Sequence, residues 1–309
     1  MLLTIFISAF AQQSDDLTNS IKKSEVVAET LCVDSGINND LVDKYKQLFK
    51  ELFIDAAQIE GLELAIFSIS TIVHELGHAT TAKTLFDVRD PIQIHIGTYT
   101  AEEATPRLFS LGNMHFYKTT PWIRGRTEWE AYIKQEQKYS LKTNLAIEAA
   151  AGGLSSAAFM YFLLSAITWY CAYCDNKKLS EITLKSLING AIPFTYILNT
   201  KNLSIKQKRF LINATLVICL SLISNIFYGC TPYRGGDGVK IWKEYMGVTG
   251  TPLKIVHVLS TLGAWGCFAL LIKKYCDARK KLSPELSKIS IPATLVSLIL
   301  MRKGLIPSM

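Results

Sequence analysis

The motif His74-Glu75-Leu76-Gly77-His78 is the group of residues best suited to chemistry in this 309-residue chain. On a helix, two histidines four residues apart lie one turn apart on the same face. Two imidazole nitrogens at that spacing can bind one zinc ion (Zn²⁺), and a glutamate beside them can take a proton from zinc-bound water. The motif therefore predicts a hydrolytic zinc site with His74 and His78 as metal ligands and Glu75 as the general base.

An apolar segment leads into this motif. Residues 62–73 carry a single charge and would form about 18 Å of helix at ~1.5 Å per residue. The hydrocarbon of a bilayer is about 30 Å thick, so a helix that enters it near Leu62 would place both histidines well inside. The same five-residue pattern arises by chance in helices without a metal. Ionisable groups at membrane depth are costly and usually functional, which favours the metal site.

Long uncharged runs indicate helices that cross a membrane. Hydrophobic residues make up 49% of the chain, and the runs 149–174, 210–233 and 255–272 contain no charge. Each run reaches the length of a spanning helix. The shorter runs 186–200 and 289–301 contain prolines and are typical of re-entrant, interfacial or bundle-packed segments. We therefore expect a mainly α, polytopic membrane helix bundle, located in the bilayer as a multi-pass protein.

The chain divides into four expected parts. Residues 1–11 resemble a signal peptide, because a short apolar stretch ends in Ala9-Phe10-Ala11; a peripheral apolar tail is the alternative. A polar N-terminal region follows at 12–57. The membrane core is expected at 58–245, with its first metal helix at about 58–86 and a strand-bearing insert at 87–142. The last part, 246–309, is expected to hold C-terminal membrane helices.

The insert shows strand patterns. Ile94 and Ile96 alternate with more polar residues, and residues 107–117 surround a Gly-Asn turn, as in a hairpin. An extended substrate peptide can pair with an exposed strand edge, so Ile94 and Ile96 are candidate substrate-binding residues. A sheet that only covers the mouth of the site is the alternative. His95 and His115 are expected to be surface histidines and not metal ligands.

The positive charge of the chain is distributed as in membrane proteins. The formal net charge is +7. Basic residues cluster at the ends of the apolar runs, at 177–178, 206–209, 273–274 and 279–281. This placement is typical of membrane flanks, so no nucleic-acid partner is expected.

A catalytic zinc usually has three protein ligands and one open position. The soluble-protease extension H-E-x-x-H-x-x-G-x-x-H is absent after His78. Glu102 and Glu103 are alternative third ligands, but the sequence around them is not typical of a helix that faces the first metal helix. Asp237 is the better candidate, because the segment 232–238 closes an uncharged run of membrane length.

These features together resemble the site-2 proteases, a family of intramembrane zinc metalloproteases. The second motif of that family ends in Asp-Gly after a later membrane helix, with a proline five positions before the aspartate, as Pro232 stands before Asp237. The resemblance covers roughly residues 58–245. It implies that Asp237 is the third zinc ligand, that Gly238 lets backbone approach the site, and that membrane proteins or peptides are the substrates.

The chain departs from the family pattern at two places. The family asparagine, three residues before the proline, is Gly229 here, and Asn225 lies one turn earlier as a candidate substitute. The small-residue segment 151–156 lacks the usual proline and asparagine. Asn225, Pro232 and Gly238 are the candidate substrate-binding residues in this part of the chain.

Topology follows from the two halves of the predicted site. His78 and Asp237 can meet at one ion only if their helices leave the membrane at the same face. Because run 149–174 crosses back and run 210–233 crosses forward, segment 186–200 is not expected to span. The signal-like start and the family topology place the metal near the cytosolic face, whereas the basic clusters predict the opposite orientation.

The expected function is zinc-dependent cleavage of peptide bonds in or near membrane-spanning segments. A membrane pseudoprotease that keeps the metal as a structural tie and binds partners without cleavage is the alternative. Glu75 favours the enzyme, since a structural site needs no general base. A soluble or peripheral zinc protease is a further alternative, which the long uncharged runs disfavour.

Overall fold

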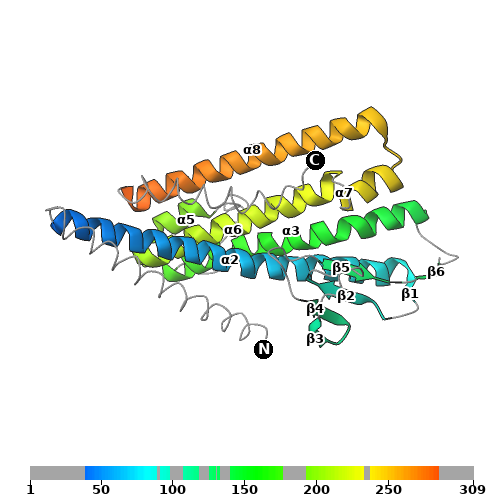
Figure 1. Cartoon of the computed structure of the whole chain (residues 1–309), viewed down its shortest axis with the longest axis horizontal. Helices are drawn as coiled ribbons and strands as arrows, with labels where there is room; N and C mark the ends of the chain where they lie inside the picture. The colour runs from blue at the N-terminus through cyan, green and yellow to red at the C-terminus, as the bar shows by residue number, and fades with distance from the viewer. Residues whose placement is uncertain are drawn as a thin grey trace.

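The computed structural model of the chain is mainly helical with a small mixed β-region (Figure 1). It describes residues 39–88, 91–97, 107–117, 125–129, 131–132, 140–176, 193–232 and 237–284. The long helices are α2 (Asn39–Leu85), α3 (Leu141–Cys174), α6 (Ile205–Cys230) and α8 (Gly250–Leu282). The shorter elements are α5 (Phe194–Asn199), α7 (Asp237–Val239) and the π-helical turn η2 (Lys240–Tyr245). The expectation of a helical fold with a strand-bearing insert is confirmed.

Each long helix contains a segment that is long and apolar enough to cross a membrane. These segments are Ile54–Leu85, Leu141–Cys174, Ile205–Gly229 and Gly250–Leu282. Three of them hold the uncharged runs of the sequence, so the prediction of helices at those runs is confirmed. The fourth holds the His-Glu-x-x-His motif.

Helix α2 is longer than predicted. The sequence predicted a metal helix at about 58–86, but α2 has 47 residues and begins at Asn39. Residues 39–60 contain neither glycine nor proline, so nothing interrupts the helix before the apolar segment. The expected boundary between residues 57 and 58 is therefore not a break in the structure.

Helices α3 and α6 begin at side-chain caps. Ser140 accepts a hydrogen bond from the backbone N–H of Thr143 at the start of α3. Ser204 and Gln207 form a reciprocal capping box at the start of α6. Of the predicted non-spanning segment 186–200, the described part is the short helix α5, which has six residues. Residues 186–192 and 289–301 lie outside the described part of the chain.

The insert forms two small sheets. Strands β2 (Gln93–Ile96), β3 (Arg107–Leu111), β4 (Met114–Tyr117) and β5 (Gly125–Glu128) lie in the order β3-β4-β2-β5. Strands β1 (Asp87–Val88) and β6 (Ala131–Tyr132) form a separate antiparallel pair. The predicted hairpin at 107–117 is confirmed as β3 and β4. Strand β2 runs parallel to β4 and antiparallel to β5.

This order corrects the expected role of Ile94 and Ile96. Both lie on β2, an interior strand whose two edges are already paired, so their backbone has no free edge for a substrate. Their side chains are buried against Ala79 of α2. The prediction of a surface histidine at 95 is also wrong, since His95 is buried with its Nδ1 3.0 Å from the hydroxyl of Tyr117.

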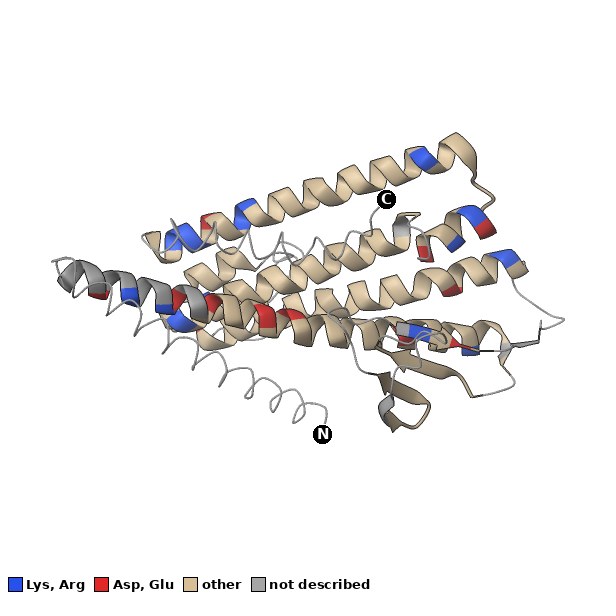
Figure 2. Ribbon diagram, viewed as in Figure 1, with Lys and Arg blue, Asp and Glu red and all other residues tan. Residues whose placement is uncertain are grey.

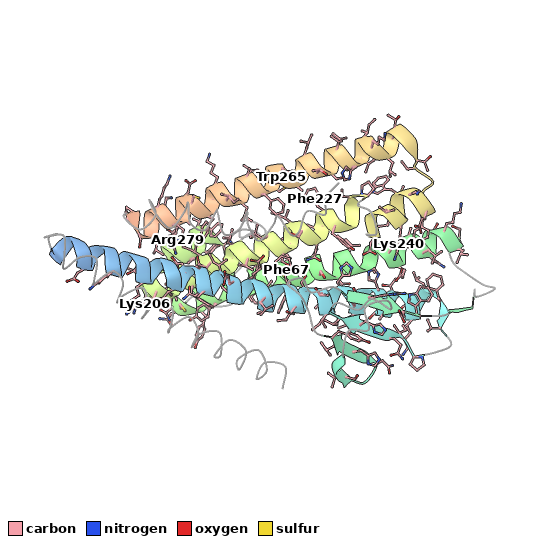
Figure 3. The ribbon with its side chains drawn as sticks, in the orientation of Figure 1. Phe67, Lys206, Phe227, Lys240, Trp265 and Arg279 are labelled. Atoms are coloured by element: carbon pink, nitrogen blue, oxygen red, sulfur yellow. The ribbon has the colours of Figure 1, made fainter. Side chains whose placement is uncertain are left out.

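A buried group of charges joins α2, α6 and α8 at the end of the bundle away from the sheet, near the labelled Arg279 in Figure 3. The carboxylate of Asp55 pairs with the guanidinium groups of Arg209 and Arg279. Asn213 donates to Asp55 across 3.1 Å, and the hydroxyl of Tyr275 donates to Asn213 across 3.2 Å. Asp55 is 1% exposed and Arg279 is 2% exposed. This network ties α8 to the other helices.

We expect Asp55→Asn to destabilise the fold strongly, because the buried guanidinium of Arg279 loses its carboxylate, while Arg209 keeps its ion pair with Glu51. Removing one partner of a buried ion pair costs ~3–5 kcal/mol. The measurement is thermal unfolding of the purified protein in detergent, with Glu60→Gln, an exposed site on the same helix, as the control. Equal melting temperatures for the two variants would contradict a stabilising role for the network.

Candidate metal centre

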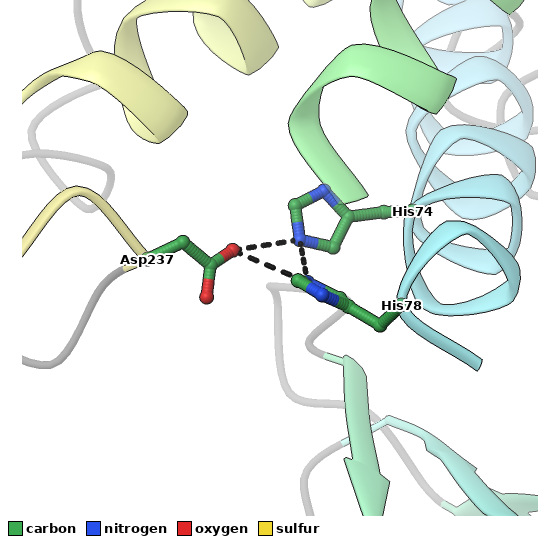
Figure 4. A group of neighbouring side chains, drawn as sticks. All are labelled: His74, His78 and Asp237. Atoms are coloured by element: carbon green, nitrogen blue, oxygen red, sulfur yellow. Dashed lines mark hydrogen bonds and ion pairs between the residues drawn. The ribbon is translucent and has the colours of Figure 1, made fainter. Parts of the chain in front are cut away.

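Three side chains from two distant segments converge at the sheet end of the bundle (Figure 4). His74 and His78 come from α2, and Asp237 is the first residue of α7. The Nε2 atom of His74 lies 3.1 Å from Asp237 Oδ2 and 3.1 Å from His78 Nε2. His78 Nε2 lies 3.3 Å from the same Asp237 oxygen. The three atoms thus form a nearly equilateral triangle.

The size of this triangle fits a shared metal ion. Zinc binds nitrogen and oxygen ligands at about 2.0–2.1 Å in a tetrahedron, which places two ligand atoms roughly 3.3 Å apart. The observed separations are 3.1, 3.1 and 3.3 Å. The group could therefore hold a metal ion with three protein ligands, and a tetrahedral ion would have one position left for water or substrate.

The hydrogen-bonding capacity of the three groups also favours a cation between them. His78 Nδ1 lies 2.9 Å from the backbone oxygen of Glu148, which can only accept, so Nδ1 carries the hydrogen. In a neutral His78 the lone pair of Nε2 then points at a carboxylate oxygen and at the second imidazole. Acceptors that face each other repel unless a cation lies between them. An imidazolium at His78 is the alternative, and the metal content of the protein separates the two.

The carboxylate of Asp237 is suited to bind a cation. Burial raises the pKa of this carboxyl, but hydrogen bonds from His74 and from His78 in its imidazolium form lower the pKa by more, so the net pKa lies below its ordinary value. Asp237 is therefore ionised at neutral pH. The side chain of Glu148 adds a second negative group behind the site, with Oε1 3.2 Å from His78 Nδ1. Carboxylates in this position orient a ligand histidine and raise its basicity.

Glycines allow α3 to lie directly against the motif. A Cβ on Gly152 would lie 2.3 Å from His78 Nε2 and 2.6 Å from His74 Nε2. A Cβ on Gly77 would lie 2.5 Å from the hydroxyl of Ser155. The sequence singled out the small-residue segment 151–156. This segment is therefore the part of α3 that closes one side of the His74–His78–Asp237 group.

Glu75 lies in the motif, buried and bound to the sheet. It is 5% exposed, and its Oε2 accepts a hydrogen bond of 2.7 Å from the hydroxyl of Thr127 on β5. The same hydroxyl lies 3.2 Å from the backbone oxygen of Glu75. Sequence reasoning missed Thr127, because β5 is short and polar and has no alternating apolar pattern.

The other candidate substrate-binding residues, Asn225, Pro232 and Gly238, lie on α6, just after it and on α7, where Asn225 and Gly238 contact neighbouring elements. The side-chain amide of Asn225 donates to Ser70 of α2 across 2.8 Å, one turn before His74. Gly238 lies against Thr231, because a Cβ there would be 2.1 Å from the Thr231 carbonyl oxygen. Pro232 is half-buried just after α6. Close backbone approach at Gly238 is thus observed, between α7 and the end of α6.

No family model, curated protein or solved structure matches this chain. Any functional assignment therefore depends on the chemistry and geometry of the site. The features that matter are the His-His-Asp triangle, the buried Glu75 beside it and the membrane-length helices that carry them.

We expect about one zinc ion per chain in the purified protein, and a large loss of zinc in Asp237→Ala, because two imidazoles alone bind the ion weakly. Metal analysis after gel filtration measures both. Asp277→Ala, an exposed site on α8, is the control and should keep its zinc. Full zinc retention in Asp237→Ala would exclude Asp237 as a ligand. A wild-type protein that stays metal-free after zinc addition would favour the imidazolium at His78.

Gly152→Ala should weaken zinc binding without changing any ligand, because its Cβ would overlap the two ligand nitrogens. We expect an affinity loss of roughly 10- to 100-fold, as is typical when the surroundings of a metal ligand are disturbed. A competitive zinc chelator titration measures it. Gly266→Ala on α8 is the matched control, because a Cβ there meets nothing within 4 Å. Equal zinc affinities would show that α3 does not confine the histidines.

Proposed function

We propose that this chain is an intramembrane zinc metalloprotease that cleaves peptide bonds in or near the membrane-spanning segments of its substrates. The observation that carries the proposal is the spacing of 3.1–3.3 Å among the ligand atoms of His74, His78 and Asp237. The resemblance of the two sequence motifs to the site-2 proteases supports the same activity. A buried glutamate next to the triangle supports catalysis over a purely structural metal.

The chain supplies the ligands and the proton-transfer group of such a reaction. A zinc ion bound to His74, His78 and Asp237 would supply Lewis acidity toward water and toward the scissile carbonyl. Glu75 accepts a proton from the attacking water, and the C–O bond forms as the water adds to the carbonyl carbon. Because Thr127 donates to Oε2, we assign the proton to Oε1, the oxygen that does not accept this bond. Glu75 then returns the proton to the leaving amine as the C–N bond breaks.

Helix α8 offers a measure of membrane depth. Its uncharged residues 255–272 lie between Lys254 and Lys273 and would extend roughly 27 Å along the helix axis. That length is close to the ~30 Å of bilayer hydrocarbon. In Figure 2 the basic residues of α8 lie toward its two ends, on either side of an uncharged stretch.

Contacts between the helices relate the level of the His74–His78–Asp237 group to this stretch of α8. Asn225 of α6 bonds to Ser70 of α2, so these two residues lie at the same level. Phe227 of α6 lies against Gly263 of α8, between the two helices in Figure 3. His74, one turn beyond Ser70, is then level with residues near 261 of α8. This level is roughly 10 Å inside the Lys254 end of the uncharged stretch, at 1.5 Å per residue. Such a depth supports cleavage within a membrane.

The sheet has an edge strand on which a substrate peptide could be held in an extended form. Amides of a helical substrate are bonded internally, so the cleaved segment must become extended. Strand β5 lies at an edge of the described four-stranded sheet, and its Thr127 touches Glu75. A peptide paired with the outer edge of β5 would lie beside the metal group, held by main-chain hydrogen bonds.

We expect Glu75→Gln to retain zinc and to lose at least about 100-fold in cleavage rate, as for removal of a general base. The assay uses vesicles that contain the protein and a randomised library of lysine-flanked apolar peptides, with products identified by mass spectrometry. Glu60→Gln is the matched control and should cleave like the wild type. If the zinc-loaded wild type binds the peptides but cleaves none, the protease proposal is overturned and the pseudoprotease alternative is favoured.

A further inference from the structure

We infer that Thr127 is a positioning residue for Glu75 and that it links the edge strand of the sheet to the proton-transfer group of the site. The inference rests on the proposed function, because it assigns Glu75 the role of general base. It concerns a residue outside both sequence motifs, on a strand that the sequence did not predict.

The contact is one that a buried carboxylate requires. Glu75 is 5% exposed, and the Thr127 hydroxyl donates to its Oε2 across 2.7 Å. A buried charged group without hydrogen bonds is costly, and a bond to a charged group is stronger than one between neutral groups. Because the bond holds one carboxylate oxygen, it restricts the rotation of the group and leaves Oε1 as the oxygen that does not accept from Thr127.

The sheet fixes Thr127 relative to α2 through a second set of contacts. On β2, Ile94 pairs with Thr127, so these two residues lie side by side. The side chain of Ile94 packs in a cluster with Ala79 of α2. Glu75 and Ala79 are four residues apart and therefore lie on the same face of the helix. The sheet thus lies on the face of α2 that carries Glu75. Because β2 pairs with β5, it holds β5 where the Thr127 hydroxyl reaches the Glu75 carboxylate.

This arrangement separates the effect of Thr127 from metal binding. None of the bonds of Thr127 involves His74, His78 or Asp237. Loss of the hydroxyl should therefore allow the carboxylate to rotate away from its working position while the metal ligands stay in place. The expected result is a lower kcat with little change in KM and no change in zinc content.

The test compares Thr127→Val, which keeps the shape but removes the hydroxyl, with Thr127→Ser, which keeps the hydroxyl. Cleavage of the best peptide from the lysine-flanked library should fall by roughly 10- to 100-fold in kcat for the valine variant, in line with loss of a bond to a charged group. The serine variant should recover most of the wild-type kcat. Thr84→Val is the matched control, because the Thr84 hydroxyl bonds only to its own helix.

A second readout does not depend on cleavage or on metal. In zinc-free protein, Thr127→Val should lower the melting temperature when Glu75 is present, because the buried carboxylate loses its donor. The same substitution should have a much smaller effect in a Glu75→Ala background. Such non-additivity is the signature of direct coupling between the two side chains.

The outcomes separate this inference from the proposed function. Equal kcat values for wild type and Thr127→Val, or additive melting shifts, would overturn the role of Thr127. A loss of zinc from Thr127→Val would also overturn it, in favour of a general structural role. If the wild type cleaves no peptide, the protease proposal fails, whereas the melting-temperature comparison still decides whether Thr127 holds Glu75.

Discussion

The structure depends on the meeting of three polar side chains at one point among apolar helices. Three atoms that can each accept a hydrogen bond, on His74, His78 and Asp237, lie within 3.3 Å of one another. In a buried site, repulsion between facing acceptors would be relieved by a shared metal ion or by a proton on His78. The close approach is possible only because α3 presents Gly152 to the imidazoles. The same few residues thus set the helix packing and the geometry of the group that could hold a metal ion.

Polar contacts at two levels hold α6 against α2 and so affect where Asp237 lies relative to the motif. Near one end, Arg209 of α6 pairs with Asp55 of α2. In the middle, Asn225 bonds to Ser70. These bonds fix the sliding and rotation of α6, and α7 begins a few residues after α6 ends. These polar bonds bring a carboxylate from far away in the sequence to the histidines, and they involve none of His74, His78 and Asp237.

The sequence predicted the parts of the site that depend on local periodicity. His74, Glu75 and His78 follow from helical spacing. The uncharged run indicated the segment 232–238, and the resemblance to the site-2 proteases implied Asp237 within it. Thr127 could not be predicted, because its contact arises from non-local strand pairing. The interior place of β2 was missed for the same reason, since the pattern at Ile94 and Ile96 shows a strand but not its neighbours. The length of α2 was missed because its polar first half resembles a separate region.

X-ray absorption at the zinc edge of the purified, zinc-loaded protein examines the proposed centre most directly. The seven cysteines of the chain could bind zinc adventitiously, and sulfur ligands are easily distinguished from nitrogen and oxygen. Coordination by two imidazoles and one or two oxygens at about 2.0–2.1 Å, with no sulfur, is the predicted result. Scattering from sulfur at about 2.3 Å, or a shell without imidazoles, would contradict a His74–His78–Asp237 centre.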